Sequence, residues 1–227
     1  MRVPARQTGQ PRQQTVVRDL LSGYGDTYAA QAGIRIADTP QPLYRTLVLS
    51  LLLSARIRAS VAVAATRALY DAGLRDARRM RDASWQQRVD ALGAGGYRRY
   101  DERTATQLGD GAQLVLDAWG GNLRRLRHEA DGDMDQLRRG LRRLPGIGPA
   151  GADIFLREVQ GVWPEVAPYL DPKALQGARS LGLPDDRTAL ARLSHRAHAD
   201  PASFAAALVR AALDPHVVEE CLHERVS

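Results

Sequence analysis

The longest apolar run in the chain, LYRTLVLSLLLSA at residues 43–55, places hydrophobic residues on nearly every face of a helix. A helix of this kind is buried on all sides, as at the centre of a bundle. A strand is the alternative for so short a run, but its length and leucine content favour a helix. The pattern therefore predicts a buried central helix.

Helical spacing of apolar residues continues along most of the chain. Leu137, Leu141 and Leu144 are four and three residues apart and form one stripe. The other faces of that helix carry Arg138, Arg139, Arg142 and Arg143. Glycines, prolines and capping residues separate further predicted helices at 15–22, 59–71, 82–93, 101–119, 150–159, 185–197, 201–213 and 215–225. The sequence predicts an all-α protein.

Composition supports this fold class and narrows the partners. The 227 residues are 44% hydrophobic, 26% charged and only 5% aromatic, which is typical of a soluble globular protein with one large or two small domains. Lys and Arg number 32 against 26 acids, and this balance favours an anionic partner, nucleic acid first. A single cysteine, Cys221, excludes an internal disulfide and a cysteine-ligated cluster.

Targeting signals are not apparent in the sequence. The run at 43–55 is too short to span a bilayer, so no membrane association is expected. Residues 1–14 are polar and basic without an apolar core, which predicts a disordered arm rather than a secretory signal. We expect a cytoplasmic, nucleoid-associated monomer.

A tight turn interrupts two helical stretches in LRRLPGIGPAGADIF, residues 141–155. Gly146 and Gly148 tolerate unusual backbone angles and leave amides uncovered, and Pro149 suits the first position of a helix. Ile147 would anchor the turn in the core. The amides would then form a cradle for a phosphate. An ordinary turn between helices is the alternative, but the full string favours a helix-hairpin-helix motif at about 134–159, which grips DNA backbone without reading sequence.

The chain resembles the helix-hairpin-helix DNA glycosylases of the endonuclease III type. Besides the glycine turn, PLYRTLVLSLLLSARIRASVAVAATRALY (42–70) is similar to that family's buried helix and the segment after it. The stretch from GGYRR to ERTATQL (95–108) is similar to its Gly-x-Tyr turn and following helix. PYLDPKALQGARSLGL (168–183) is similar to the segment that carries the family's aspartate, which falls on Asp171.

The resemblance implies two helical domains with a DNA-binding cleft between them. Residues 39–163 would form a six-helix domain that contains the hairpin, and residues 15–38 with 164–227 would form the second domain. The partner would be double-stranded DNA with a damaged base or an abasic site, and the base would be flipped out for removal.

Asp171 is the candidate catalytic residue. Followed by Pro172, it predicts a helix N-cap, where backbone amides favour the ionised carboxylate. The resemblance implies that this carboxylate stabilises the cation-like sugar and orients a water molecule. Bifunctional relatives use a hairpin lysine as nucleophile, but Ala150 occupies that position here. We therefore expect a monofunctional glycosylase.

Lys173 is the single lysine in the sequence and is expected to contact phosphate, although its amine is also a candidate nucleophile. Arg56 occupies the position of a family glutamine that fills the gap left by a flipped base. Tyr97 and Tyr100 are candidates for the base pocket. The remaining expected DNA contacts are Arg142, Arg143, Leu144, Gly146, Ile147, Gly148 and Ala150.

No iron–sulfur cluster or other cofactor is expected, because the family's four-cysteine motif is absent. A hairpin of this type can hold a monovalent cation through backbone carbonyls, as in some relatives. Two alternatives to the glycosylase stay open: a non-catalytic DNA-binding protein of the same fold, and an abasic-site lyase that acts through Lys173 or the N-terminal amine. The lesion itself is not encoded in any local signature.

Overall fold

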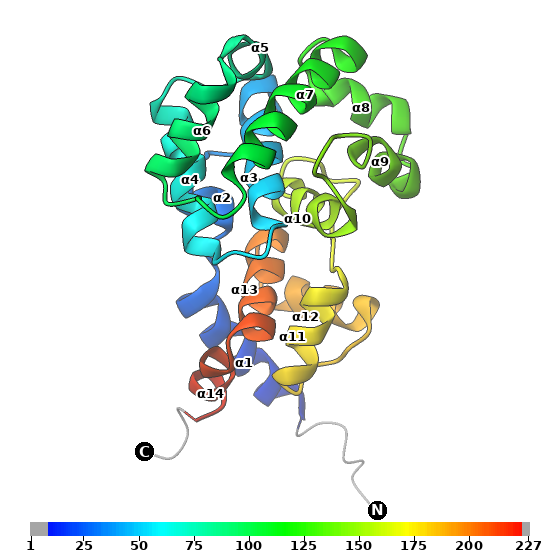
Figure 1. Ribbon diagram of the computed structural model, residues 1–227. Coiled ribbons are helices and arrows are strands. Elements are labelled where there is room, and N and C mark those ends of the chain that lie inside the picture. Colours follow the sequence, from blue (N-terminus) through cyan, green and yellow to red (C-terminus); the bar gives the residue numbers. More distant parts are fainter. Residues whose placement is uncertain (1–8, 224–227) are drawn as a thin grey trace, which may run out of the picture. The chain divides into compact units, whose positions relative to one another are not determined.

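The computed structural model describes residues 9–223, and every regular element within them is a helix (Figure 1). The all-α prediction is thereby confirmed for the described part of the chain. The described residues fall into two compact units, a larger one of residues 28–166 and a smaller one of residues 9–27 with 167–223. The resemblance had suggested boundaries at 38/39 and 163/164.

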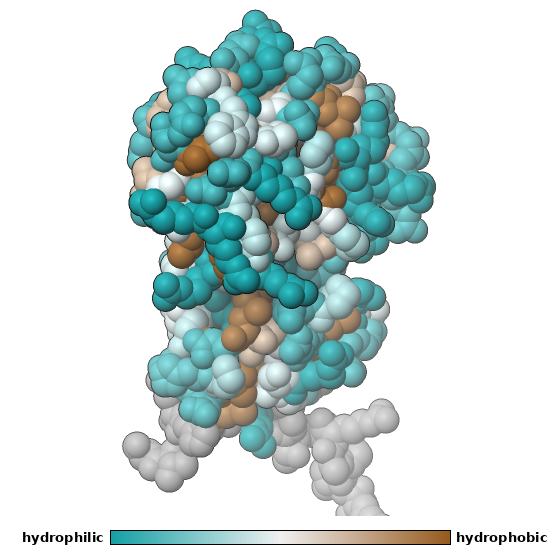
Figure 2. Space-filling model, viewed as in Figure 1, coloured by the Kyte–Doolittle hydropathy of each residue, from teal (hydrophilic) through white to brown (hydrophobic). Residues whose placement is uncertain are grey.

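Nine helices form the larger unit, on whose visible face hydrophilic residues predominate (Figure 2). They are α2 (Tyr28–Gln31), α3 (Pro40–Leu53), α4 (Ala59–Asp71), α5 (Ala77–Asp82), α6 (Trp85–Ala94), α7 (Asp101–Trp119), α8 (Leu123–Ala130), α9 (Met134–Leu141) and α10 (Pro149–Val159).

Helix α3 is the buried central helix that the apolar run predicts. Nearly all of its residues from Leu43 to Leu52 are buried, and it packs against α2, α4, α8 and α10. Two polar residues on it satisfy themselves locally, because Thr46 donates to the Pro42 carbonyl at 2.9 Å and Ser50 donates to the Thr46 carbonyl at 2.7 Å. The helix therefore buries no unpaired hydroxyl at these positions.

A buried arginine joins α5, α6 and α7. Arg88 donates from Nε to the Ala105 carbonyl at 2.8 Å, and from Nη1 to the carbonyls of Met80 at 2.9 Å and Ala83 at 2.8 Å. The guanidinium leaves no room on α7 for a side chain at Gly109, where a Cβ would lie 2.7 Å from Nη2. Arg88 thus holds α5, α6 and α7 together through three directed hydrogen bonds.

Helix α2 depends on a residue far away in the sequence. The buried carboxylate of Glu158 on α10 accepts the N–H groups of Tyr28 at 3.3 Å and Ala29 at 2.9 Å. These are amides of the first turn, which a helix cannot satisfy internally. A four-residue helix has little stability of its own, so this long-range contact supports it.

The smaller unit contains α1 (Gly9–Tyr24), α11 (Pro172–Ser180), α12 (Arg187–Arg196), α13 (Pro201–Leu213) and α14 (Pro215–His223). Its core is built on close packing of α11 against α13. Gly177 permits that approach, since a Cβ there would lie 1.8 Å from the Leu208 carbonyl oxygen. Helix α11 is thereby held firmly in its unit.

Some predicted boundaries differ from the structure. The predicted arm at 1–14 is helical from Gly9 on, so the expectation of disorder is wrong for residues 9–14, while residues 1–8 lie outside the described part. Glutamine and arginine favour helices, and Pro11 falls in the first turn, where its missing N–H costs nothing. The sequence patterns also missed α2, α5 and α8. Within residues 9–223, no helix is long and apolar enough to span a bilayer.

Candidate nucleic-acid interface

The segment between α9 and α10, residues 144–149, is here called the glycine turn. Gly146 adopts φ +85°, in the region that glycine occupies without strain. The turn is closed by a hydrogen bond of 3.0 Å from the Ile147 N–H to the Leu144 carbonyl. Leu144 and Ile147 are buried, whereas Gly146 and Gly148 are exposed. The two apolar residues therefore anchor the turn, and the glycines face outward.

Helix α10 begins directly at the end of this turn. Gly148 is its N-cap with φ −88° and ψ −170°, makes no side-chain cap, and is followed by Pro149 at the first helical position. The first intrahelical bond runs from the Ala152 N–H to the Gly148 carbonyl at 3.0 Å. Amides before Ala152 belong to the group that a helix leaves unsatisfied, and the dipole makes this end attractive to anions. Ala150 is exposed here and offers only a methyl group.

Backbone carbonyls of the turn bear on the expected monovalent cation. Those of Leu144 and Gly148 accept hydrogen bonds from Ile147 and Ala152. Each carbonyl keeps a second lone pair, so the turn is chemically compatible with a weakly bound cation.

Two of the four arginines around the turn are engaged in ion pairs. Arg138 on α9 lies 3.7 Å from Asp153 on α10 and 3.2 Å from Asp135, so it ties the two helices together. Arg139 lies 3.9 Å from Asp133, the N-cap of its own helix. These charges are partly neutralised within the protein.

The other two arginines are the better candidates for phosphate. Arg142 is the C-cap of α9, and both Arg142 and Arg143 are exposed. The guanidinium carbon of Arg143 lies 5.3 Å from the centre of the fully buried Trp119 ring. The ring face orients this arginine without neutralising its charge.

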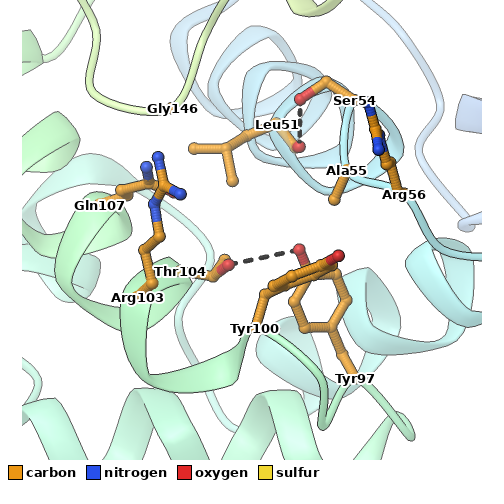
Figure 3. A pocket seen from close by; sticks show the side chains of 10 residues that line it. All are labelled: Leu51, Ser54, Ala55, Arg56, Tyr97, Tyr100, Arg103, Thr104, Gln107 and Gly146. Atoms are coloured by element: carbon orange, nitrogen blue, oxygen red, sulfur yellow. Dashed lines mark hydrogen bonds between the residues drawn. The ribbon is translucent and has the colours of Figure 1, made fainter.

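An open cavity of about 430 Å³ adjoins the glycine turn (Figure 3). Its wall comes from the end of α3 and the segment after it, from the loop before α7, from the first turns of α7, and from Gly146. The lining residues are Leu51, Ser54, Ala55, Arg56, Tyr97, Tyr100, Arg103, Thr104, Gln107 and Gly146. Sequence-predicted residues Arg56, Tyr97, Tyr100 and Gly146 are thus brought together around one space.

Hydroxyl groups in the cavity wall are held by hydrogen bonds. Thr104 Oγ1 donates to the Tyr97 hydroxyl at 3.3 Å, and Ser54 Oγ donates to the Leu51 carbonyl at 2.7 Å (Figure 3). Burial raises the pKa of the Tyr97 phenol further above its ordinary value, so the hydroxyl keeps a hydrogen to donate even in alkaline solution. These bonds orient the wall before any ligand arrives.

The cavity wall contains no carboxylate, while it includes Arg56 and Arg103, both exposed. Tyr100 is half-buried, and the Arg99 guanidinium carbon lies 5.2 Å from the centre of its ring. A wall with two guanidinium groups, an amide and aromatic surface suits an anionic ligand that also carries a flat ring. Nucleotides have both features.

Asp171 lies in the smaller unit, where it is the N-cap of α11. Its backbone has φ −74° and ψ 173°, its Oδ1 accepts the Ala174 N–H at 2.8 Å, and Pro172 follows at the first helical position. The predicted cap is confirmed. The residue is only 3% exposed, and Arg187 Nε donates to the preceding Leu170 carbonyl at 2.8 Å. The carboxylate is therefore rigidly placed.

Lys173 is exposed on the first turn of the same helix. Its Nζ donates to Gln176 Oε1 at 2.8 Å, one turn further along α11. The amine is accessible to solvent, and a single exposed hydrogen bond to a neutral amide holds it weakly. Both phosphate contact and amine chemistry remain chemically open to it.

Sequence reasoning missed Arg103, Thr104 and Gln107 as members of the cavity. Together with Tyr100 they recur at spacings of three and four residues, which places them on one face of α7. That periodic polar face directly follows Gly95-Gly96-Tyr97 and could have been read from the sequence. That this face lines a cavity could be seen only in the structure, where the glycine turn contributes Gly146 to the same wall.

Comparison with known proteins adds no relative to this picture: the chain matches no family model, no curated protein and no solved structure.

Proposed function

We propose that this protein is a DNA repair glycosylase that hydrolyses the N-glycosidic bond of a damaged base in double-stranded DNA. The observation that carries the proposal is the glycine turn. Gly146 at φ +85° precedes an uncapped helix start at Gly148, and Gly146 also lines a cavity that contains arginine and tyrosine but no carboxylate. This arrangement supports a helix-hairpin-helix that holds DNA backbone through amides and arginines.

The proposed chemistry uses Asp171 and water. As the C1′–N bond breaks, the base leaves with the electron pair and acquires a proton, and positive charge develops on the sugar. A fixed carboxylate near C1′ stabilises that charge, and water adds to C1′ while losing its proton to the carboxylate or to solvent. Ala150 has no amine, which supports hydrolysis by water over a covalent lysine intermediate. We accordingly propose a monofunctional enzyme.

Arg56 and the two tyrosines receive supporting roles in this proposal. Arg56 follows α3, is exposed at the cavity and could fill the space of a flipped nucleotide. Tyr100 offers a half-buried ring on which a base could stack. Tyr97 is 1% exposed, so its part would be limited to its hydroxyl and to support of Tyr100.

A lesion panel tests the proposal. Duplexes that contain uracil, an oxidised pyrimidine, an alkylated purine or an abasic site are incubated with the protein and then treated with alkali, which cleaves abasic strands. Strand cleavage at a base lesion by wild type, lost in Asp171→Asn, is the expected result. Intact strands for every base lesion would refute the glycosylase.

A non-catalytic DNA-binding protein of the same fold is the second candidate. The burial of Asp171, 3% exposed, favours it, because a carboxylate that mainly caps a helix offers little surface to a sugar. Tight binding of the duplexes without cleavage at any base lesion would identify this function.

An abasic-site lyase is the third candidate, and the exposure of Lys173 favours it. Its amine would condense with the C1′ aldehyde of an abasic site, releasing water and forming an imine. Borohydride reduction would then trap a covalent adduct in wild type that is absent in Lys173→Ala.

A further inference from the structure

Trp85, at the first position of α6, is one of two large hydrophobic residues that are exposed in the described chain, with 41% of its surface accessible. Single exposed hydrophobic residues are common and need no function. Trp85 differs from that ordinary case because its ring is held in place.

The indole is held by hydrogen bonds that form a chain. Trp85 Nε1 donates to Thr106 Oγ1 on α7 at 3.2 Å, and Thr106 in turn donates to the Glu102 carbonyl at 3.2 Å. The backbone at this point is secured by a capping box between Ser84 and Gln87. The partly exposed indole is therefore held in an ordered position, and a ligand that stacks on it loses little conformational entropy.

The same helix connects Trp85 with the cavity. Thr106 lies three residues after Arg103 and one before Gln107, and both of those residues line the cavity. Residues three apart on a helix are surface neighbours. A strand that leaves the cavity across α7 would thus meet the exposed Arg103 and then the Trp85 ring.

Acidic residues also lie near this route. Asp82, at the end of α5, is paired with Arg81, and Asp90 on α6 accepts the Gln86 amide at 2.8 Å, while Glu102 is exposed next to Arg103 on α7. A guanidinium beside an aromatic face is the combination that binds the phosphate and base of a nucleotide. Paired bases in a duplex hide their faces from such a ring, so the matching occupant is an unpaired base.

We propose that Trp85 is a stacking platform for an unpaired nucleotide of bound DNA, outside the cavity. This inference rests on the DNA binding in the proposed function but not on base excision. It adds a second contact point to the interface and predicts that DNA with unpaired bases binds more tightly than a fully paired duplex.

Tryptophan emission provides a direct test in the wild-type protein. Trp119 and Trp163 have no exposed surface, so quenching by added DNA would report on Trp85. A dye-labelled single-stranded oligonucleotide and a fully paired duplex are titrated, and anisotropy measures binding while emission measures stacking. We expect saturable quenching by the single strand that follows its binding curve.

Three variants complete the experiment. Trp85→Phe keeps an aromatic face and should keep most of the affinity while the quenching disappears. Trp85→Ala should weaken single-strand binding about tenfold and leave duplex binding nearly unchanged. Thr106→Val removes the hydrogen-bond acceptor of the indole and should weaken single-strand binding by an intermediate amount.

The outcomes separate this inference from the proposed function. Binding without quenching, or an equal loss of both DNA forms in Trp85→Ala, would overturn the stacking platform alone. Quenching and a selective loss without any base excision would sustain the platform and refute the glycosylase. If neither the single strand nor the duplex binds, both the stacking platform and the proposed function are overturned.

Discussion

Gly146 faces the side-chain amide of Gln107 so closely that a Cβ on the glycine would lie 2.8 Å from Gln107 Oε1. The contact joins the glycine turn to α7 and therefore to the cavity. The Gln107 side chain can rotate away from such a Cβ, so the φ of +85° at Gly146 is what restricts this position to glycine.

Replacement of Gly146 by alanine is expected to lower the free energy of unfolding by about 1–3 kcal/mol, because a φ of +85° strains a residue with a side chain and the Gln107 side chain must move aside. Urea denaturation measures the change. Gly148→Ala is the matched control: its φ is −88° and a Cβ there meets nothing within 4 Å. Equal stability of the two variants would contradict the geometric argument.

Replacement of Arg142 or Arg143 by alanine should weaken DNA binding to all sequences alike. Each loss of a phosphate contact should reduce the slope of log affinity against log salt by about one. Anisotropy titrations at several salt concentrations measure that slope. Arg139→Ala, on the same helix but within reach of Asp133, should change it less, and an equal change in all three variants would speak against the assignment.

Asp171 has a structural and a proposed chemical role that two substitutions separate. Asparagine caps helices about as well as aspartate, so Asp171→Asn should keep the stability yet reduce single-turnover excision by about 100-fold or more. Asp171→Ala should in addition lose about 1 kcal/mol of stability. Unchanged excision in Asp171→Asn would exclude the carboxylate charge from the chemistry.

Introduction of lysine at Ala150 should create an activity. The residue is exposed near the start of α10, so the longer side chain meets no packing obstacle. Its amine should form an imine with the aldehyde of an abasic site, and borohydride should trap the adduct on a denaturing gel. Ala150→Arg carries the same charge without a nucleophilic amine and should give no more adduct than wild type. If both variants trapped equal amounts of adduct, the result would contradict binding of an abasic sugar near the start of α10.

Arg88→Met is expected to destabilise the larger unit. The carbonyls of Met80 and Ala83 have no intrahelical donor, because the Ser84 and Gln87 amides bond to side chains, so both would lose their partner, and each buried unsatisfied group costs about 1–3 kcal/mol. Thermal unfolding followed by circular dichroism measures the loss. Arg78→Met, at an exposed position on α5, should unfold at the wild-type temperature. A wild-type melting temperature for Arg88→Met would show that water replaces the guanidinium without cost.

The sequence by itself determined the features that depend on a few neighbouring residues. Apolar spacing predicted α3 and α7, and cap chemistry predicted the start of α11 at Asp171 and Pro172. The glycine turn was also local, because glycines and a proline restrict the backbone before any packing occurs. In such cases the interacting groups lie within one or two turns of helix, so the local order of residues is enough to predict the structure.

Only the tertiary structure decided which distant residues meet. Glu158 supports α2 from about 130 positions away, Arg88 selects carbonyls on two other helices, and Gln107 reaches Gly146. The cavity with Arg103 and the ordered face of Trp85 follow from the same packing. Each of these contacts depends on which helix faces come together, and that choice is made by the burial of the whole core rather than by any short stretch of chain.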